Sequence, residues 1–511
     1  MKNYLQRRKR IFCLVAPALI GLLYIILCFI NIRQSIWFDE SYSSYITRFD
    51  YPTMLRFTAA DVHPPLYYIV LKTWAHFFGH TDFAMRILSA FLGAAAIVFV
   101  FLWLKYKHGA SAAILGSLMV AISPVFVRYG QEMRMYTMVA LIVFAATYVL
   151  QLAIDNGAKK WWVIYAILLA AGMYTHYFVA FAWIAHLVYL IKIYGKKVFQ
   201  KKIVLTYIAA VVMYLPWIPS FITQATTVQN GFWISKANAT SFMDYWTEVF
   251  LYDKAANIQN WLLVLFIATV LTVAYLAIRY RKKLAMIFCL AFVPLIVLIL
   301  LSMPPLESMF ISRYIVYAMV AISILEALLI VLFAREKMAQ KIKKGTPFYK
   351  YPAVHIAIIV ALLISCSICG LKSVYDYGNY NFVTDVKPTA KEAFDNLVAL
   401  DNGENLSIIS EDPWLYYDLA AYASDQHNVF FIDEQTSYEY GSLLPLKESY
   451  FGKINDLDRF LEKRDAVWYI GKYSKDQPLT FPREGWRVTT EASWRFDERG
   501  DRYEILKLER D

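Results

Sequence analysis

The chain has 511 residues, of which 59% are hydrophobic and only 18% are charged. Soluble domains usually carry about 25% charged and about 45–50% apolar residues, so this composition excludes an ordinary soluble protein. The net charge of +11 does not indicate nucleic-acid binding, because Lys and Arg gather between long apolar runs, the pattern of a multi-spanning helical membrane protein.

Clusters of Lys and Arg predict how the chain is threaded through the membrane. Cytoplasmic ends of spans carry an excess of these residues, and the first cluster lies at 7–10, so we expect a cytoplasmic N-terminus. Further clusters follow at 105–107, 159–160, 192–202, 279–283 and 335–344. If all of them are cytoplasmic, each neighbouring pair of clusters brackets two spans.

Eleven apolar runs fit this threading. They lie at about 11–32, 83–104, 111–127, 135–154, 161–175, 178–193, 203–221, 260–278, 284–302, 311–334 and 353–371. The first run has no small-residue cleavage site, so we interpret it as a retained span rather than a signal peptide.

One more run, at about 64–79, does not fit, because a span needs roughly 20 apolar residues. It carries Lys72, His76 and His80 four residues apart, which gives one polar face. We therefore expect an amphipathic juxtamembrane helix in the first outer loop. The predicted fold is mostly α: a polytopic helical membrane protein of about 11 spans, with the N-terminus inside and the C-terminus outside.

The composition changes beyond about Lys372. Strand candidates lie at 406–410, 429–432 and 466–470. Between them, Asp412 and Pro413 predict the start of a helix that runs to about residue 424. We therefore predict a transmembrane domain at 1–371 and a small extracytoplasmic α/β domain at 372–511.

The cysteines predict neither a disulfide framework nor a metal site. All five fall in predicted spans, where a thiol behaves as a small apolar group. Cys366 and Cys369 form a C-x-x-C pair, but no second pair completes a zinc site. We expect no cofactor; a divalent metal would be compatible with the chemistry below, but no motif indicates one.

Acidic residues in the first outer loop are candidate catalytic groups. Asp39 and Glu40 directly follow the first span, and Asp61 and His63 lie near the end of the loop. The structural alternative for Asp39 and Glu40 is an acidic cap on a helix that begins near Ser41.

Cations on the outer side break the positive-inside pattern. Arg128, Arg134 and Arg313 all lie there by the threading above, and such misplaced cations indicate a site for an anionic headgroup. The structural alternative is ion pairing, with Glu132 for the first two and with Glu307 for Arg313.

Carboxylates and arginines together suit one reaction. Glycosyl transfer from a polyprenyl monophosphate releases a phosphate that is already a good leaving group, so cations that hold the developing charge suffice. The acceptor hydroxyl does need a base, which a carboxylate can supply.

These motifs resemble those of the C-type membrane glycosyltransferases, in particular the bacterial relatives of protein O-mannosyltransferases and lipid A aminoarabinose transferases. The matching pieces occur in order over the first two thirds of the chain. They are Phe38-Asp39-Glu40, Asp61-Val62-His63-Pro64-Pro65-Leu66, Arg86, Tyr129-x-Gln131-Glu132-x-Arg134-x-Tyr136, Thr175-His176-Tyr177-Phe178 and Arg313-Tyr314.

The resemblance implies roles for individual residues. Asp39 would be the general base, with Glu40 beside it. The acceptor side would be lined by Asp61, His63 and Glu132. The donor and its lipid phosphate would be held by Arg134, Arg313, Lys72, Tyr136, His176 and Tyr314. The alternative for His176, alone in a short outer turn, is a structural role.

The predicted activity is thus inverting transfer of a hexosyl or pentosyl group from a polyprenyl-phosphate sugar, such as an undecaprenyl-phosphate sugar, to a glycan, lipid or protein acceptor. The active site would face outward from a plasma membrane. An alternative is a transporter or flippase of lipid-linked sugars, which usually shows inverted repeats and buried ionisable residues such as Glu326 and His186. A non-catalytic scaffold is a third alternative.

Overall fold

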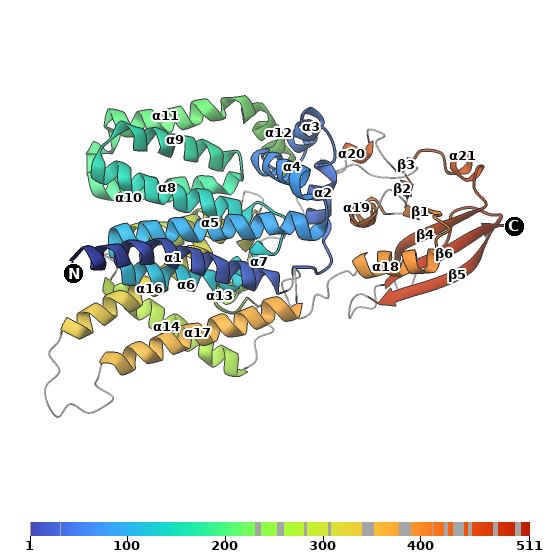
Figure 1. The fold of residues 1–511 in the computed structure, drawn as a ribbon. Helices are drawn as coiled ribbons and strands as arrows, with labels where there is room; N and C mark the ends of the chain where they lie inside the picture. Colours follow the sequence, from blue (N-terminus) through green and yellow to red (C-terminus); the bar gives the residue numbers. More distant parts are fainter. Residues whose placement is uncertain are drawn as a thin grey trace. The chain divides into compact units, whose positions relative to one another are not determined.

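The chain forms two compact units. The computed structural model describes residues 2–30, 32–229, 237–252, 260–280, 284–304, 308–339, 352–377, 390–410, 412–423, 428–432, 444–447, 452–473, 479–495 and 502–511. The helical unit consists of Met1–Ile32 and Arg86–Asp376, and the mixed unit consists of Arg33–Met85 and Tyr377–Asp511 (Figure 1). Residues 33–85 thus group with the C-terminal residues, which the sequence did not indicate.

The described part of the helical unit is built from helices. They are α1 (Lys2–Phe29), α5 (Asp82–His108), α6 (Ala110–Ala121), α7 (Pro124–Gly130), α8 (Tyr136–Asn156), α9 (Lys159–Met173), α10 (Ala180–Tyr194), α11 (Lys201–Tyr214), α12 (Ile218–Gln229), α13 (Ala239–Leu251), α14 (Asn260–Tyr280), α15 (Ala285–Leu301), α16 (Val316–Ala339) and α17 (Pro352–Tyr377). Among the described residues, 7 helical stretches are long and apolar enough to cross a membrane, or 8 if α6 and α7 form one bent span. The prediction of a multi-pass helical membrane protein is confirmed.

The described residues contain a helix in every range where the sequence predicts a span. The described apolar part of α1 (Leu14–Phe29), α9 and α15 are shorter than the other spans. The total of 11 spans, and the orientation of the two termini, therefore stay predictions.

The run predicted as one span at 111–127 is bent. α6 and α7 meet at an angle of 61°. Ser123, between them, is extended, with φ −65° and ψ 120°, and Pro124 opens α7. Proline disfavours the helical conformation in the residue before it, which explains the bend. The bend positions α7, which carries Arg128.

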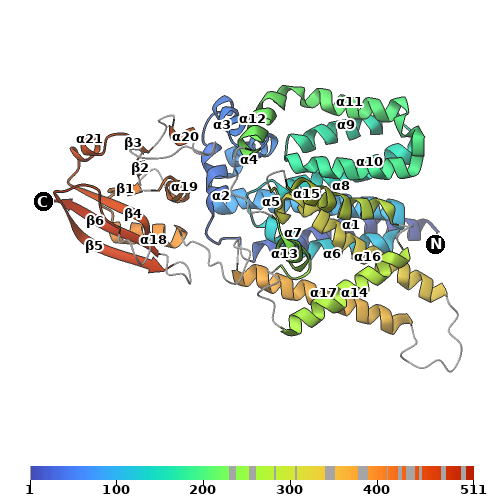
Figure 2. The same ribbon diagram turned by 180° about the vertical axis from the view of Figure 1, so that it is seen from behind.

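The core of the helical unit lies around α8 and α16. The apolar windows of α8 and of Ser312–Glu336 are 83% and 94% buried, against 17–22% for the windows in α11, α14 and α17. α16 is apolar on all sides, as expected for a helix enclosed by others. Figure 2 shows α8, α9 and α11 as successive layers on one side of this core.

The C-terminal part of the mixed unit is an α/β fold. Its six-stranded sheet has the order β3-β2-β1-β4-β6-β5, with parallel pairing from β3 to β4 and antiparallel pairing among β4, β6 and β5. The strands are β1 (Ser407–Ser410), β2 (Val429–Ile432), β3 (Lys453–Ile454), β4 (Ala466–Tyr473), β5 (Trp486–Arg495) and β6 (Arg502–Arg510). The helices are α18 (Ala390–Asp401), α19 (Pro413–Tyr422), α20 (Leu444–Lys447) and α21 (Leu457–Leu461). β1, β2, β4 and α19 lie where the sequence predicts strands and a helix.

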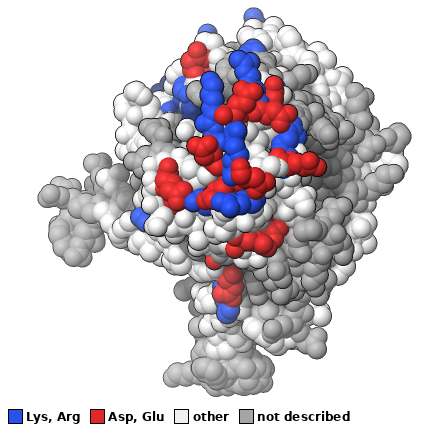
Figure 3. Space-filling model, turned by 90° about the vertical axis from the view of Figure 1, so that its right-hand side faces the viewer, with Lys and Arg blue, Asp and Glu red and all other residues white. Residues whose placement is uncertain are grey.

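Charges of both signs cover the exposed side of this sheet. Lys507 contacts Glu404 at 2.7 Å, and Arg487 contacts Glu509 at 3.5 Å. Figure 3 shows Lys and Arg interspersed with Asp and Glu over one face of the molecule. Interspersed charges also discourage edge-to-edge pairing of strands such as β5, which ends the sheet.

Candidate functional site

A buried ion pair marks the start of the α7–α8 connection. Arg128 Nη1 donates to Glu132 Oε2 at 2.7 Å, and the two side chains are only 2% and 0% exposed. The structural alternative for Glu132 is therefore present: the carboxylate neutralises Arg128 from one helical turn away. A buried pair of this kind is sensitive to loss of either partner, because the remaining charge stays in a low dielectric.

Two further arginines are buried in the helical unit. Arg134 follows Glu132 in the same connection and is 2% exposed. Arg86, in the first turns of α5, is fully buried and donates from Nη1 to the carbonyl of Ile32 at 2.7 Å. Ser89, one turn further along α5, donates to the carbonyl of Arg134 at 3.4 Å. Contacts from α5 thus fix the backbone that carries Arg134.

Aromatic side chains from separate segments meet beside this connection. The ring of Tyr136, at the first position of α8, lies 6.1 Å from that of His176. The His176 ring lies 5.4 Å from Tyr314, which in turn lies 4.6 Å from Phe178. The Arg313 guanidinium lies 5.9 Å from the centre of the Tyr314 ring. The structure therefore brings together four of the residues predicted to hold the donor.

His176 also has a local structural role. Its Nδ1 accepts a hydrogen bond from the backbone N–H of Phe178 at 3.3 Å and so begins the short helix η1 (Tyr177–Val179). With Nδ1 as an acceptor, a neutral ring carries its proton on Nε2. The ring is thus oriented by the turn while it contacts the aromatic residues on either side.

The carboxylates of the first loop lie in the mixed unit. Asp39 and Glu40 are in the first turn of α2 (Phe38–Ile46), where a helix favours negative charge. Glu40 is fully buried, and Asp39 is half-buried. The acidic-cap alternative is thus also present, one turn earlier than expected. Of the two, Asp39 is the more accessible to an acceptor.

Asp61 and His63 form a pair. Asp61 ends α3 (Tyr51–Ala60), and its Oδ2 lies 3.1 Å from His63 Nδ1. Pro65 then begins α4 (Leu66–Phe78), which matches the amphipathic helix predicted at 64–79. Within the described ranges, no group of three or more His, Cys, Asp or Glu side chains is placed to hold a metal ion.

Tyrosines of α19 hold α2 in place, a contact that the sequence analysis missed. Ser41 Oγ donates to Asp418 Oδ1 at 2.6 Å. The Tyr45 and Tyr417 rings lie 4.9 Å apart, edge to face. Burial, followed by the neighbouring Tyr416 and Asp61, raises the pKa of Tyr417 well above its ordinary value. The signal that could have predicted the contact is the concentration of aromatic residues in one short helix, Pro413–Tyr422.

Lys72 lies in the mixed unit. Its Nζ donates to the carbonyl of Thr47, the residue that ends α2, at 3.0 Å, and lies 5.2 Å from the centre of the Tyr51 ring. A cation at a helix C-terminus is stabilising. The structure thus gives Lys72 a contact that fixes α4 to α2, and its predicted contact with the donor stays a prediction.

One of the two ionisable residues singled out in the spans belongs to the core of the helix bundle. His186 is fully buried and lies 3.0 Å from both Thr147 Oγ1 and Tyr165 OH. Both ring nitrogens therefore have hydrogen-bond partners within the helix bundle. Such a histidine is part of the core, which removes one of the two residues that could have favoured a transporter.

Comparison with known proteins identifies the class. A family model described as dolichyl-phosphate-mannose-protein mannosyltransferase matches residues 62–219, which include Glu132, Arg134, Tyr136 and His176. No curated protein matches the chain. Together with the solved structures below, this match shows that the chain has the fold of the C-type membrane glycosyltransferase superfamily, as the motifs predicted.

Two solved structures illustrate the likeness. ArnT from Cupriavidus metallidurans, bound to undecaprenyl phosphate, is 13% identical, with a TM-score of 0.57 and 97% of each chain covered. The archaeal oligosaccharyltransferase AglB from Archaeoglobus fulgidus, in complex with an inhibitory peptide and a dolichol-phosphate, is 12% identical, with a TM-score of 0.51, 91% of this chain covered and 70% of that one. The similarity therefore extends over both units.

Proposed function

We propose that the protein transfers a sugar from a polyprenyl-phosphate donor to an acceptor at the extracytoplasmic face of a plasma membrane, with inversion at the anomeric carbon. The observation that carries the proposal is the meeting of Tyr136, His176 and Tyr314, with Arg313, next to the buried Arg134. The whole-chain likeness to a structure that holds undecaprenyl phosphate supports the same ligand class.

In this proposal the cations stabilise the leaving group. As the bond from the anomeric carbon to the phosphate oxygen breaks, negative charge grows on the phosphate. Arg134 and Arg313 would hold it through charge-assisted hydrogen bonds, which are strongest where water is excluded. The rings of Tyr136, His176 and Tyr314 offer an amphipathic surface for the sugar.

Asp39 would remove the proton from the acceptor hydroxyl as that oxygen attacks the anomeric carbon. It is half-buried and lies on a helix held by α19, so the mixed unit would serve to position the base. Asp61, His63 and Glu132 would lie on the acceptor side, with Glu132 acting through its pair with Arg128. The acceptor would be a glycan, a lipid or a protein hydroxyl, and no step requires a metal.

The test is release of undecaprenyl phosphate from a panel of radiolabelled undecaprenyl-phosphate sugars by the full chain in detergent. Asp39→Asn should lose at least about 10²-fold in turnover with donor binding retained, as expected for a lost general base. Asp395→Asn, a matched change at an exposed carboxylate of α18, should be unaffected. Equal turnover in wild type and Asp39→Asn would exclude Asp39 as the base.

A further inference from the structure

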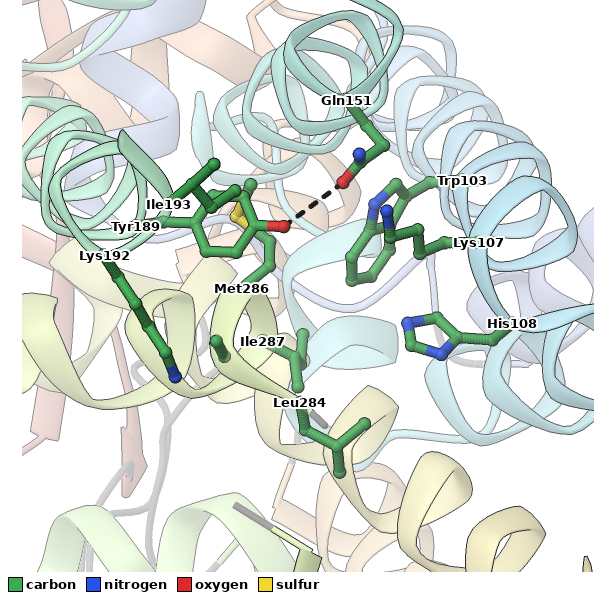
Figure 4. Close-up of a pocket in the computed structure, with 11 residues that line it drawn as sticks. Trp103, Lys107, His108, Gln151, Tyr189, Lys192, Ile193, Leu284, Met286 and Ile287 are labelled. Carbon is green, nitrogen blue, oxygen red and sulfur yellow. Dashed lines mark hydrogen bonds between the residues drawn. The ribbon is translucent and has the colours of Figure 1, made fainter. Parts of the chain in front are cut away.

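A cavity lies within the helical unit, towards the end of α8 away from Tyr136. Its volume is about 260 Å³, enough for several water molecules of about 30 Å³ each. It is bounded by the ends of α5, α8 and α10 and by the start of α15 (Figure 4). It is lined by Trp103, Lys107, His108, Gln151, Tyr189, Lys192, Ile193 and Leu284–Ile287.

The cavity lies towards the C-terminal end of α8, whereas the Tyr136 cluster lies at its start, so the two would face opposite membrane surfaces. α8 begins at Tyr136 and ends at Asn156, and its 21 residues span about 31 Å at 1.5 Å per residue. The hydrocarbon core of a bilayer is about 30 Å thick. The cavity is therefore separate from the candidate site described above.

Several hydrogen-bond donors lie in the walls, among apolar side chains. Lys107 and Lys192 contribute ammonium groups from different helices. Trp103 is 1% exposed, and its indole N–H has no hydrogen-bond partner in the described part of the chain. Leu284 precedes the first turn of α15 and cannot cap it, so the first amides of that helix add further donors.

The amide acceptor in the walls is already engaged. Gln151 Oε1 accepts from Tyr189 OH at 3.4 Å (Figure 4), and Gln151 Nε2 donates to Asp155 at 2.9 Å. Asp155 lies 3.7 Å from Lys107, a long contact between partly exposed groups, and such pairs are weak. Arg335 adds another cation nearby, since it donates to the carbonyl of His108 at 2.7 Å. The surplus of donors and positive charge suits a ligand that only accepts, such as phosphate.

We propose that this cavity binds the phosphate headgroup of a membrane lipid, in the leaflet opposite the candidate active site. Exposed apolar side chains of α10, Ile191 and Ile193, continue from the cavity onto the surface of a candidate membrane span. Basic pockets between spans are known to bind anionic lipid headgroups in this way. The inference does not depend on glycosyl transfer.

The test measures lipid binding to the full chain in detergent by thermal shift and native mass spectrometry. The probes are phosphatidylglycerol, undecaprenyl phosphate, inorganic phosphate and, as the zwitterionic reference with no net charge, phosphatidylcholine. Lys192→Gln and Lys107→Gln should each weaken phosphatidylglycerol or undecaprenyl phosphate binding about tenfold, because each removes a charge-assisted contact. Trp103→Phe, which removes the N–H together with the five-membered part of the indole, should weaken it about fivefold.

Lys105→Gln is the matched control, since Lys105 is an exposed lysine of the same helix that does not line the cavity. An equal loss in this variant would mean non-specific attraction and would overturn the proposal. Inorganic phosphate that binds as tightly as the lipids, with the same dependence on Lys192, would overturn the lipid assignment. Lys192→Arg keeps the positive charge and should bind the lipid as the wild type does. This variant distinguishes an effect of charge from a loss of folding.

Discussion

The two ends of the helical unit hold positive charge in different ways. Near Tyr136, Arg128 and Arg134 are buried, and Arg128 is paired with Glu132 at 2.7 Å. At the far end of α8, Lys107 and Lys192 are exposed around a cavity, and the Lys107 pair with Asp155 is loose. Buried, fixed charges in a low dielectric can stabilise the charge that develops in a transition state. Exposed lysines around a cavity can instead bind a lipid headgroup.

The largest expected contrast between the ends is in stability. Glu132→Gln leaves Arg128 buried without its counter-charge and should lower the free energy of unfolding by about 3–5 kcal/mol. Asp155→Asn removes an exposed partner of Lys107 and should cost about 0–1 kcal/mol. Denaturation in mixed micelles measures both, and similar losses would mean that the two ends do not differ as described.

A smaller contrast concerns donor binding. Tyr314→Ala removes the ring contacts with His176 and Phe178, each worth about 0.5–1.5 kcal/mol, and should raise KM for the lipid-linked donor about three- to tenfold. Tyr148→Ala removes a ring contact with Tyr106 towards the other end of α8 and should leave KM unchanged. A KM that rises in both variants would point to a general loss of packing.

The mixed unit allows a similar comparison within one helix. Ser41 donates to Asp418 of α19, whereas Ser43 donates to the carbonyl of Asp39 within α2. Ser41→Ala should speed hydrogen exchange of α2 by an amount equivalent to about 1–3 kcal/mol, because Asp418 loses a partner. Ser43→Ala should have the smaller effect. Equal protection in the two variants would argue against α19 as the support of α2.

The smallest expected effect is a pH dependence in the first loop. Burial, followed by the nearby Arg48 and Lys72, lowers the pKa of His80 below its ordinary value of about 6.5. The folded form therefore binds this proton less readily than the unfolded chain, so stability is full above about pH 6.5 and falls as the pH drops towards the folded pKa. Thermal unfolding between pH 7.5 and 5 should show a shallower decline in His80→Gln than in wild type.

Periodic and compositional features were predictable from the sequence. A helix lies in every range where an apolar run predicts a span, and the short apolar run at 64–79 predicted α4 to within two residues at either end. These features depend on neighbours in the chain, which the sequence shows directly.

Long-range contacts were not predictable in the same way. The packing of α2 on α19 joins residues almost 380 positions apart, such as Ser41 and Asp418. The resemblance places Lys72 at the donor, which stays a prediction, whereas the Thr47 carbonyl that it contacts carries no sequence signal. The bend before Pro124 could have been predicted, because this proline lies within the apolar run at 111–127. The hydropathy of the run alone does not indicate the bend.

The central claim is that the phosphate of a lipid-linked sugar reacts at the Tyr136 end of the helical unit. The direct measurement is the release of undecaprenyl phosphate from an undecaprenyl-phosphate sugar by the Arg134→Gln variant. The Lys105→Gln variant, which loses a charge at the other end of the helical unit, is the control. We predict that Arg134→Gln loses at least about 10²-fold in kcat, as for removal of a group that stabilises developing charge, with Lys105→Gln unchanged. Full turnover in a folded Arg134→Gln variant would contradict the account.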